Sequence, residues 1–238
     1  HIDESPTKEG QDKAWVWTFV AGAFTFFACR TSRAAEVATQ LLGAAFAGVV
    51  HCDRARMYWA FGRLQWCWAH LKRDFQAPID SPCPTTRRLG WDLMRPTKEM
   101  FALWKKVRDG TLSRRQFQQQ MQPLRVQVEG LLLRGYFKAC LHGFCKELWE
   151  HRERLWVFVD SEGIEPTNNA AEQALRHAVI WRKLSFGTQS ASGSRFVERM
   201  LTVIETCRRQ NRNVYAWLTD AVQAHLAGQP TPSLLFGA

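Results

Sequence analysis

The chain has 238 residues, of which 46% are hydrophobic and 12% are aromatic, so we expect a folded protein with a sizeable core and exclude a disordered chain. No apolar run approaches the length of about 20 residues that a membrane-spanning helix needs, and the charged segment Ile2 to Gly10 does not resemble a secretory leader. The net charge of +10 favours a polyanionic partner, above all nucleic acid, although a merely basic globular protein stays open. We therefore expect a soluble cytoplasmic protein, with no membrane association. Because the first residue is a histidine, we also expect upstream sequence to be missing.

The cysteines predict a reducing compartment, because their number is odd and no C-x-x-C pair occurs. They are Cys29, Cys52, Cys67, Cys83, Cys140, Cys145 and Cys207. Cys67 and His70 have a spacing that zinc sites use, but no second pair of ligands accompanies them. We therefore expect no zinc site, with Cys67 in the core and His70 either near a phosphate or packed in the fold.

The first third of the chain predicts an α/β sheet. We interpret Ile2 as the end of a strand, with Pro6 and Gly10 in the turn that follows. Runs rich in β-branched and aromatic residues predict strands at Ala14–Ala21, Thr25–Arg30, Gly48–Asp53 and Leu64–Trp68. Apolar residues at helical spacing predict helices at Arg33–Leu42, capped by Ser32, at Arg54–Phe61 and from His70 onward.

The middle of the chain predicts a helical insertion. Three prolines in Pro78–Pro84 indicate a linker, and Thr85 to Val159 carries long helical patterns that we expect to break at Pro96 and Pro123. Beyond it, the stretch Glu165 to Arg176 predicts a loop that leads into a helix carrying Glu172. A polar Gly/Ser loop, two helices at about Arg195–Gln210 and Val214–Leu226, and a loosely ordered tail from Gly228 complete the pattern.

Three acids are candidate metal ligands: Asp3, Asp53 and Glu172. Enzymes that cut phosphodiesters with two divalent ions hold those ions with carboxylates, and acids at strand ends and helix starts are held rigidly. Each acid also has a structural interpretation. Asp3 could be a solvated terminal acid, Asp53 could cap the helix that starts at Arg54, and Glu172 could form a capping box with Asn169.

Helical projection places Glu172 at the edge of a buried face. Small and apolar residues form that face at Ala171, Ala174, Leu175 and Ala178. Arg176 and Lys183 project near Glu172, which suits a carboxylate beside phosphate-binding cations. It equally suits an i,i+4 ion pair between Glu172 and Arg176.

Several motifs occur in one order along the chain. They are His-x-Asp-Glu at the start, Val-Val-x-x-Asp ending at Asp53, Cys67-Trp-Ala-His-Leu-Lys-Arg73, Asn168-Asn-Ala-Ala-Glu172 and Ile180-Trp-Arg-Lys183 followed by Ser-Phe-Gly. In this order they resemble the transposases of the insertion sequence 66 family, bacterial DDE transposases with an RNase H-like core. The resemblance extends from Asp3 to about Leu226, and the blocks around Cys67 and Asn168 are specific in combination.

The resemblance implies an α/β fold with a mixed, five-stranded, RNase H-like sheet flanked by helices, and an all-helical insertion before the last catalytic helix. The interval of 119 residues from Asp53 to Glu172 is long for an uninterrupted core and fits such an insertion. We accordingly expect core segments at 1–77 and 161–227, the insertion at 78–160 and a tail at 228–238.

The resemblance also implies Asp3, Asp53 and Glu172 as catalytic residues that bind two Mg²⁺ or Mn²⁺ ions. Candidate DNA contacts, each equally interpretable as part of a solvated face, are His70, Lys72, Arg73, Asn168, Asn169, Arg176, Arg182, Lys183, Arg195 and Arg199. The chain departs from the family where Thr167 replaces an Asp and Gln173 replaces an Arg, which leaves Glu172 as the third acid. Most tryptophans are expected in the core, although some could stack on bases.

The expected function is a DNA transposase catalytic domain that hydrolyses phosphodiesters at transposon ends and transfers the 3′-OH strand into target DNA. Its expected partners are the transposon ends, the target DNA and at least a second copy of the chain, in the bacterial cytoplasm at the nucleoid. A nuclease or resolvase without strand transfer is one alternative. A truncated, inactive remnant that binds DNA through its charge is another, because upstream DNA-binding segments are expected to be absent.

Overall fold

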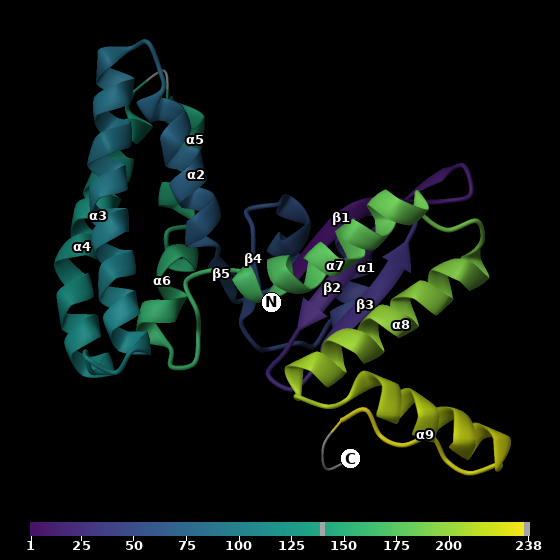
Figure 1. The fold of residues 1–238 in the computed structure, drawn as a ribbon. Coiled ribbons are helices and arrows are strands. Elements are labelled where there is room, and N and C mark those ends of the chain that lie inside the picture. Colours follow the sequence, from purple (N-terminus) through teal and green to yellow (C-terminus); the bar gives the residue numbers. More distant parts are fainter. Residues whose placement is uncertain (139–140, 236–238) are drawn as a thin grey trace. The chain divides into compact units, whose positions relative to one another are not determined.

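A computed structural model describes residues 1–138 and 141–235 as a mixed α/β protein (Figure 1). The chain forms two compact units. Residues 1–46, 55–61 and 168–235 form the first, here called the sheet unit. Residues 47–54 and 62–167 form the second, here called the helical unit. Cys140 lies outside the described residues.

The sheet unit is built on three antiparallel strands in the order β1-β2-β3. Their bounds are β1 Ile2–Glu9, β2 Asp12–Val20 and β3 Thr25–Arg30. The predicted second and third strands are confirmed, but the turn predicted at Pro6 is wrong, because β1 continues to Glu9 and turns at Gly10 with φ 59°. Pro6 is tolerated because β1 is an edge strand of this sheet, whose one neighbouring strand in the sheet order is β2.

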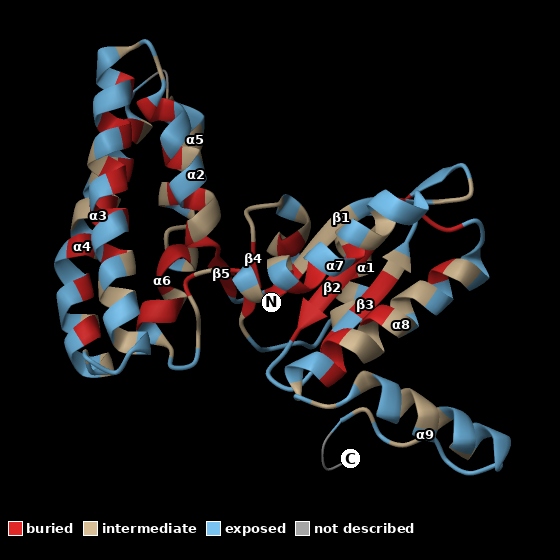
Figure 2. Ribbon diagram, in the orientation of Figure 1, coloured by how far each residue is buried: buried red, intermediate tan, exposed pale blue. Residues whose placement is uncertain are grey.

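Helices cover both faces of this sheet. The helical segments of the unit are α1 Ala35–Leu42, the 3-10 helix η1 Arg56–Ala60, α7 Asn169–Ser185, α8 Ala191–Arg209 and α9 Val214–Leu226. On one face, Val16, Val20 and Phe27 pack against α7 and against Leu201 of α8 (Figure 2). On the other, the ring of Trp17 meets Tyr58 of η1 edge-on, with 6.4 Å between ring centroids. Because successive side chains of a strand point to opposite faces, β2 packs against helices on both faces of the sheet.

Two predicted helix starts are wrong in detail. The N-cap of α1 is Ala34 instead of Ser32, because the Ser32 hydroxyl accepts a 3.1 Å hydrogen bond from the Ala34 amide and forms the preceding turn. The last part of the predicted Gly/Ser loop is already helical, since the Ser190 hydroxyl caps α8 through the Gly193 amide at 3.2 Å. Whether a serine before a helix caps the helix or forms a turn thus depends on which backbone amide its hydroxyl can reach.

Apart from residues 139–140, the helical unit consists of a two-stranded parallel sheet and five helices. The strands are β4 Val50–Cys52 and β5 Leu64–Trp66. The helices are α2 Trp68–Ile79, α3 Pro84–Arg108, α4 Arg114–Tyr136, α5 His142–Glu150 and α6 Glu153–Asp160. The helical patterns predicted from Thr85 to Val159 are thus confirmed, and the strands at β4 and β5 are confirmed although shorter than expected.

The prolines of the helical unit were misinterpreted as breaks. Pro96 and Pro123 lie inside α3 and α4, and Pro78 lies inside α2. A proline inside a helix costs about 3 kcal/mol, which the burial of long apolar stripes on α3 and α4 offsets. The linker shrinks to residues 80–83, since Pro84 occupies the first turn of α3, where its missing N–H costs nothing.

Buried side chains join β5 and the start of α2 to α6. The rings of Trp68 and Trp156 lie 5.0 Å apart, and both side chains are almost fully buried. Gln65 is 0% exposed, and its amide oxygen accepts a 2.8 Å hydrogen bond from the Phe158 amide. The predicted core role of the tryptophans is confirmed for Trp17, Trp66, Trp68 and Trp156.

The mixed α/β class is confirmed, whereas a single five-stranded sheet does not appear among the described residues, whose named strands form one sheet of three and one of two. The predicted segments 1–77, 78–160, 161–227 and 228–238 stay a prediction. The tail is held in part, because the Leu234 carbonyl accepts a 3.0 Å hydrogen bond from the Gln210 side chain. Across the described residues, every helix is too short or too polar to cross a membrane.

Candidate active site

The register of β1 separates its two neighbouring acids. Asp3 lies opposite Thr18 and Glu4 lies opposite Trp17 on β2. Because paired residues share a face and neighbours alternate, Asp3 belongs to the face covered by α7 and α8, and Glu4 to the opposite face. Only Asp3 is therefore on the same side of the sheet as Glu172.

Glu4 has a structural role. Its side chain is 4% exposed and forms an ion pair with Arg33 at 2.5 Å, and it accepts a hydrogen bond from the Tyr58 hydroxyl. A buried carboxylate needs such partners, because burying an unpaired charge is very costly. Of these two neighbouring acids, Asp3 is therefore the one that fits a metal site.

Glu172 lies in the first turn of α7. The predicted apolar stripe of this helix is confirmed, since Ala171, Ala174, Leu175 and Ala178 are all buried. The predicted capping box is wrong: the N-cap is Asn168, Asn169 is already helical, and no side chain caps the helix. Glu172 is therefore not bound to an Asn169 cap.

Asn168 explains why the cap is missing. Its side chain is 1% exposed, and its amide nitrogen donates a 2.7 Å hydrogen bond to the carbonyl of Ile2. The Asn168 carbonyl accepts the Glu172 amide at 3.2 Å. Asn168, which lies one turn before Glu172, is thus bonded through its side chain to Ile2, which directly precedes Asp3. Asp3 and Glu172 belong to elements whose ends are fastened together.

Thr18 is a polar side chain that the sequence analysis missed. It is 0% exposed, it pairs with Asp3 across the sheet, and its hydroxyl has no hydrogen-bond partner within residues 1–138 and 141–235. A buried hydroxyl without a partner costs about 1–3 kcal/mol. The sheet face of Asp3 therefore carries a buried hydroxyl whose hydrogen bonds are not satisfied by described residues.

Asp53 belongs to the helical unit and directly follows β4. Its predicted role as a helix cap is wrong, because the N-cap of η1 is Ala55 and no side chain caps it. Since β4 and β5 are parallel, Asp53 and the start of α2 lie at the same edge of this sheet. The loop before α7 is fastened at this edge too, by a 2.9 Å hydrogen bond from the Trp68 amide to the Pro166 carbonyl.

Two neighbours of Asp53 stabilise this edge. Arg54 forms ion pairs with Asp74 at 2.8 Å and Glu147 at 2.7 Å. The His51 ring nitrogen Nε2 accepts a 3.2 Å hydrogen bond from the Glu165 amide. Burial lowers the pKa of His51 to about 4, so the ring stays neutral and able to accept at neutral pH.

The cysteines with shifted pKa values are structural thiols. Burial raises the pKa of Cys29 to about 12 and of Cys145 to about 11, and burial together with Asp53 raises that of Cys52. Since the thiolate is the reactive form, none of these three thiols is set up as a nucleophile.

The predicted DNA contacts divide into two groups. Exposed side chains are Lys72 and Arg73 on α2, Asn169, Arg176 and Lys183 on α7, and Arg195 and Arg199 on α8. His70 is half-buried on α2. Asn168 is buried, and Arg182 donates hydrogen bonds to Ser5 and to the Pro6 carbonyl, so these two side chains tie α7 to β1. The exposed group offers charge to a phosphate backbone on both units.

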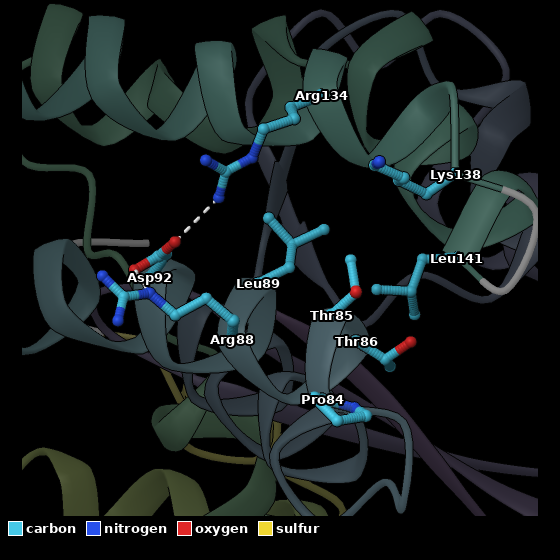
Figure 3. Close-up of a pocket in the computed structure, with 9 residues that line it drawn as sticks. All are labelled: Pro84, Thr85, Thr86, Arg88, Leu89, Asp92, Arg134, Lys138 and Leu141. Atoms are coloured by element: carbon cyan, nitrogen blue, oxygen red, sulfur yellow. Dashed lines mark hydrogen bonds and ion pairs between the residues drawn. The ribbon is translucent and has the colours of Figure 1, made fainter.

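The helical unit also contains a cavity of about 480 Å³ at the start of α3 (Figure 3). Arg88 and Arg134 line it, but both form ion pairs with Asp92, at 3.2 and 2.7 Å. Because both arginines are already paired with that carboxylate, and Asp3, Asp53 and Glu172 do not line the cavity, it is not the candidate active site.

Comparisons with known proteins give the chain a family. A family model described as "Transposase IS66 family" matches residues 1–195. The uncharacterized protein y4jD of Sinorhizobium fredii is 24% identical over 228 residues, which cover 89% of this chain and 43% of that protein. The uncharacterized protein y4qI of the same organism is 23% identical over 265 residues, which cover 93% of this chain and 46% of that protein. The chain thus spans less than half the length of these relatives. No solved structure matches it.

Proposed function

The chain belongs to the transposase IS66 family, and from this premise we propose that it is the catalytic part of a DNA transposase that cuts and joins DNA at Asp3, Asp53 and Glu172. The observation that carries the proposal is the hydrogen bond from Asn168 to Ile2, which fastens the start of the Glu172 helix beside Asp3. Family membership supports a transposase role in general. The chemistry assigned to the three acids is our proposal.

The residues present fit magnesium or manganese. Asp3, Asp53 and Glu172 offer the hard oxygen ligands that these ions prefer, and the Thr18 hydroxyl is an oxygen without a described partner on the Asp3 face. Bound in a pair, such ions activate the attacking oxygen and stabilise the leaving oxygen of a phosphodiester. We include no zinc in the proposal.

The protein's own part is positioning. Asp3 is held by the β1–β2 register, Glu172 by the first turn of α7, and Asp53 by the end of β4. The motifs that contain Asp3, Asp53 and Glu172 occur in the order that resembles the family. We propose on this basis that the three carboxylates act together. We also propose that the five strands, β1 to β5, form one RNase H-like sheet.

Two consecutive reactions follow from one such site. Water attacks the phosphodiester at a transposon end and leaves a 3′-OH. That hydroxyl then attacks target DNA, so that a new phosphodiester forms as an old one breaks. Exposed cations on α2, α7 and α8 hold the phosphate backbones, and at least two copies of the chain hold the two transposon ends.

A nicking assay with the 238-residue chain tests the proposal. In Mg²⁺ or Mn²⁺ the wild type nicks DNA, whereas Asp3→Asn, Asp53→Asn and Glu172→Gln each slow nicking about a thousandfold, because metal stabilisation of the transition state amounts to several kcal/mol. Glu36→Gln, an exposed acid on α1, is the matched control and stays active.

The alternatives give different results. Nicking that survives the three substitutions contradicts the assignment of the acids. Cleavage without joining of a pre-cut 3′-OH end indicates a nuclease or resolvase. Salt-dependent DNA binding by the wild type without any cleavage indicates a DNA-binding remnant.

A further inference from the structure

Phe186 is an exposed aromatic in an unfavourable backbone conformation. It follows α7 with φ 60° and ψ 18°, the left-handed region that bulky side chains rarely adopt. Its side chain is 80% exposed. The fold therefore holds a strained phenylalanine and obtains little burial from its ring, a combination that points to a role outside the fold.

Hydrogen bonds on both sides hold this ring in place. The Phe186 amide donates to the Arg182 carbonyl at 2.8 Å, which closes the end of α7. The Thr188 amide then donates to the Lys8 carbonyl at 3.0 Å. Between them, Gly187 has φ 104°, and a Cβ there would lie 2.5 Å from the Lys8 carbonyl oxygen. The loop is thus fastened to β1, and the backbone that carries the ring is held on both sides.

Cations surround the ring. Phe186 lines a cavity of about 280 Å³ together with Pro6, Thr7, Lys8 and Arg182. Lys8 and, one turn away, Lys183 are exposed and form no ion pair with described residues. An aromatic face beside cations matches the requirements of an unpaired nucleotide, whose base stacks and whose phosphate is negative.

We propose that Phe186 is a stacking platform for an unpaired DNA base, with Lys8 and Lys183 on the adjoining phosphates. This inference rests on the DNA substrate of the proposed function. DNA is favoured over a protein partner because the chain carries a net charge of +10 and Lys8, which forms no ion pair with described residues, lines the cavity beside this ring.

Fluorescence and affinity measurements on a duplex with a bulged 2-aminopurine test the proposal, in Ca²⁺ so that the DNA stays intact. Phe186→Asn removes the ring while keeping a residue that tolerates the left-handed conformation, so the fold is retained. Phe186→Trp keeps an aromatic face. Tyr215→Asn on α9 is the matched control, because Tyr215 is 81% exposed in the same unit.

We expect the wild type to quench the 2-aminopurine and to prefer the bulged over the fully paired duplex. Phe186→Asn abolishes the quenching and weakens binding to the bulged duplex about tenfold, with paired-duplex affinity changed less than twofold. Phe186→Trp restores both signals, and Tyr215→Asn matches the wild type.

Quenching and preference that survive Phe186→Asn overturn the inference and leave the proposed function standing. A wild type that binds neither duplex overturns the DNA substrate itself. If Phe186→Asn instead converts a dimer to a monomer in sedimentation and leaves the base signal unchanged, the ring belongs to a protein interface and the inference is wrong.

Discussion

The two units hold their acids by different means. In the sheet unit, Asp3 lies in regular strand register and Glu172 lies in a regular helix, and one buried amide, Asn168, joins them. In the helical unit, Asp53 follows a strand of three residues, and its surroundings depend on His51 and Arg54 bonding to residues about 90 or more positions away. Both places therefore use long-range polar contacts, but the first pair also lies in a long strand and a long helix, whereas the third acid follows a strand of three residues.

Of the stability differences that we expect between the two units, the largest comes from the titration of His51 in the helical unit. Burial lowers its pKa to about 4, whereas an unfolded histidine has a pKa near 6.5. Between these pH values the unfolded chain binds a proton that the folded chain does not. Stability is therefore fully present above about pH 6.5 and falls as the pH falls toward 4, by up to about 3 kcal/mol.

His51→Gln removes this titration while keeping an oxygen that can accept the Glu165 amide. Urea unfolding at several pH values measures the difference. We expect the wild type to lose up to about 3 kcal/mol more than the variant between pH 7 and pH 4. Parallel losses in the two proteins would show that His51 does not set the acid stability of the helical unit.

In the sheet unit we expect a smaller change in unfolding free energy, which can be measured by substituting two adjacent asparagines. Asn168→Ala leaves the buried Ile2 carbonyl without its donor and should cost about 1–3 kcal/mol in unfolding free energy. Asn169→Ala alters an exposed residue that does not cap α7, and should change stability by less than about 0.5 kcal/mol. Thermal or urea unfolding of both variants checks this, and equal effects would refute the role given to Asn168.

The smallest effect concerns DNA binding by the exposed cations. Removing one phosphate contact lowers the slope of log affinity against log salt by about 1. We expect this change for Arg199→Ala in the sheet unit and for Lys72→Ala in the helical unit. Arg125→Ala is the control, because Arg125 forms ion pairs with Glu129 and Asp160. If the slope changes in only one of these two variants, only the unit that carries that residue contacts DNA.

Local patterns predicted much of the fold. Strands β2 and β3, helix α9 and the buried stripe of α7 follow from periodicity in windows of a few residues, and the structure confirms them. Pro96 and Pro123 were misinterpreted because the packing that offsets a proline in a helix comes from distant residues.

The candidate site shows the same limit. The family motifs supplied Asp3, Asp53 and Glu172, whereas Thr18 and the donor role of Asn168 were missed. Thr18 is one more β-branched residue in a strand pattern, and its link to Asp3 appears only with the strand register. The Asn168 side chain looked like a DNA contact because its acceptor, the Ile2 carbonyl, is 166 residues away.

The central claim is that acids from both units hold the same metal ions, and Mn²⁺ binding tests it most directly. Calorimetry and electron paramagnetic resonance on the DNA-bound chain, compared with Asp3→Asn, Asp53→Asn and Glu172→Gln, report sites without requiring activity. We predict that each substitution, in either unit, removes or strongly weakens the same Mn²⁺ sites. Sites that are lost with Asp3→Asn and Glu172→Gln but persist unchanged in Asp53→Asn would contradict the claim.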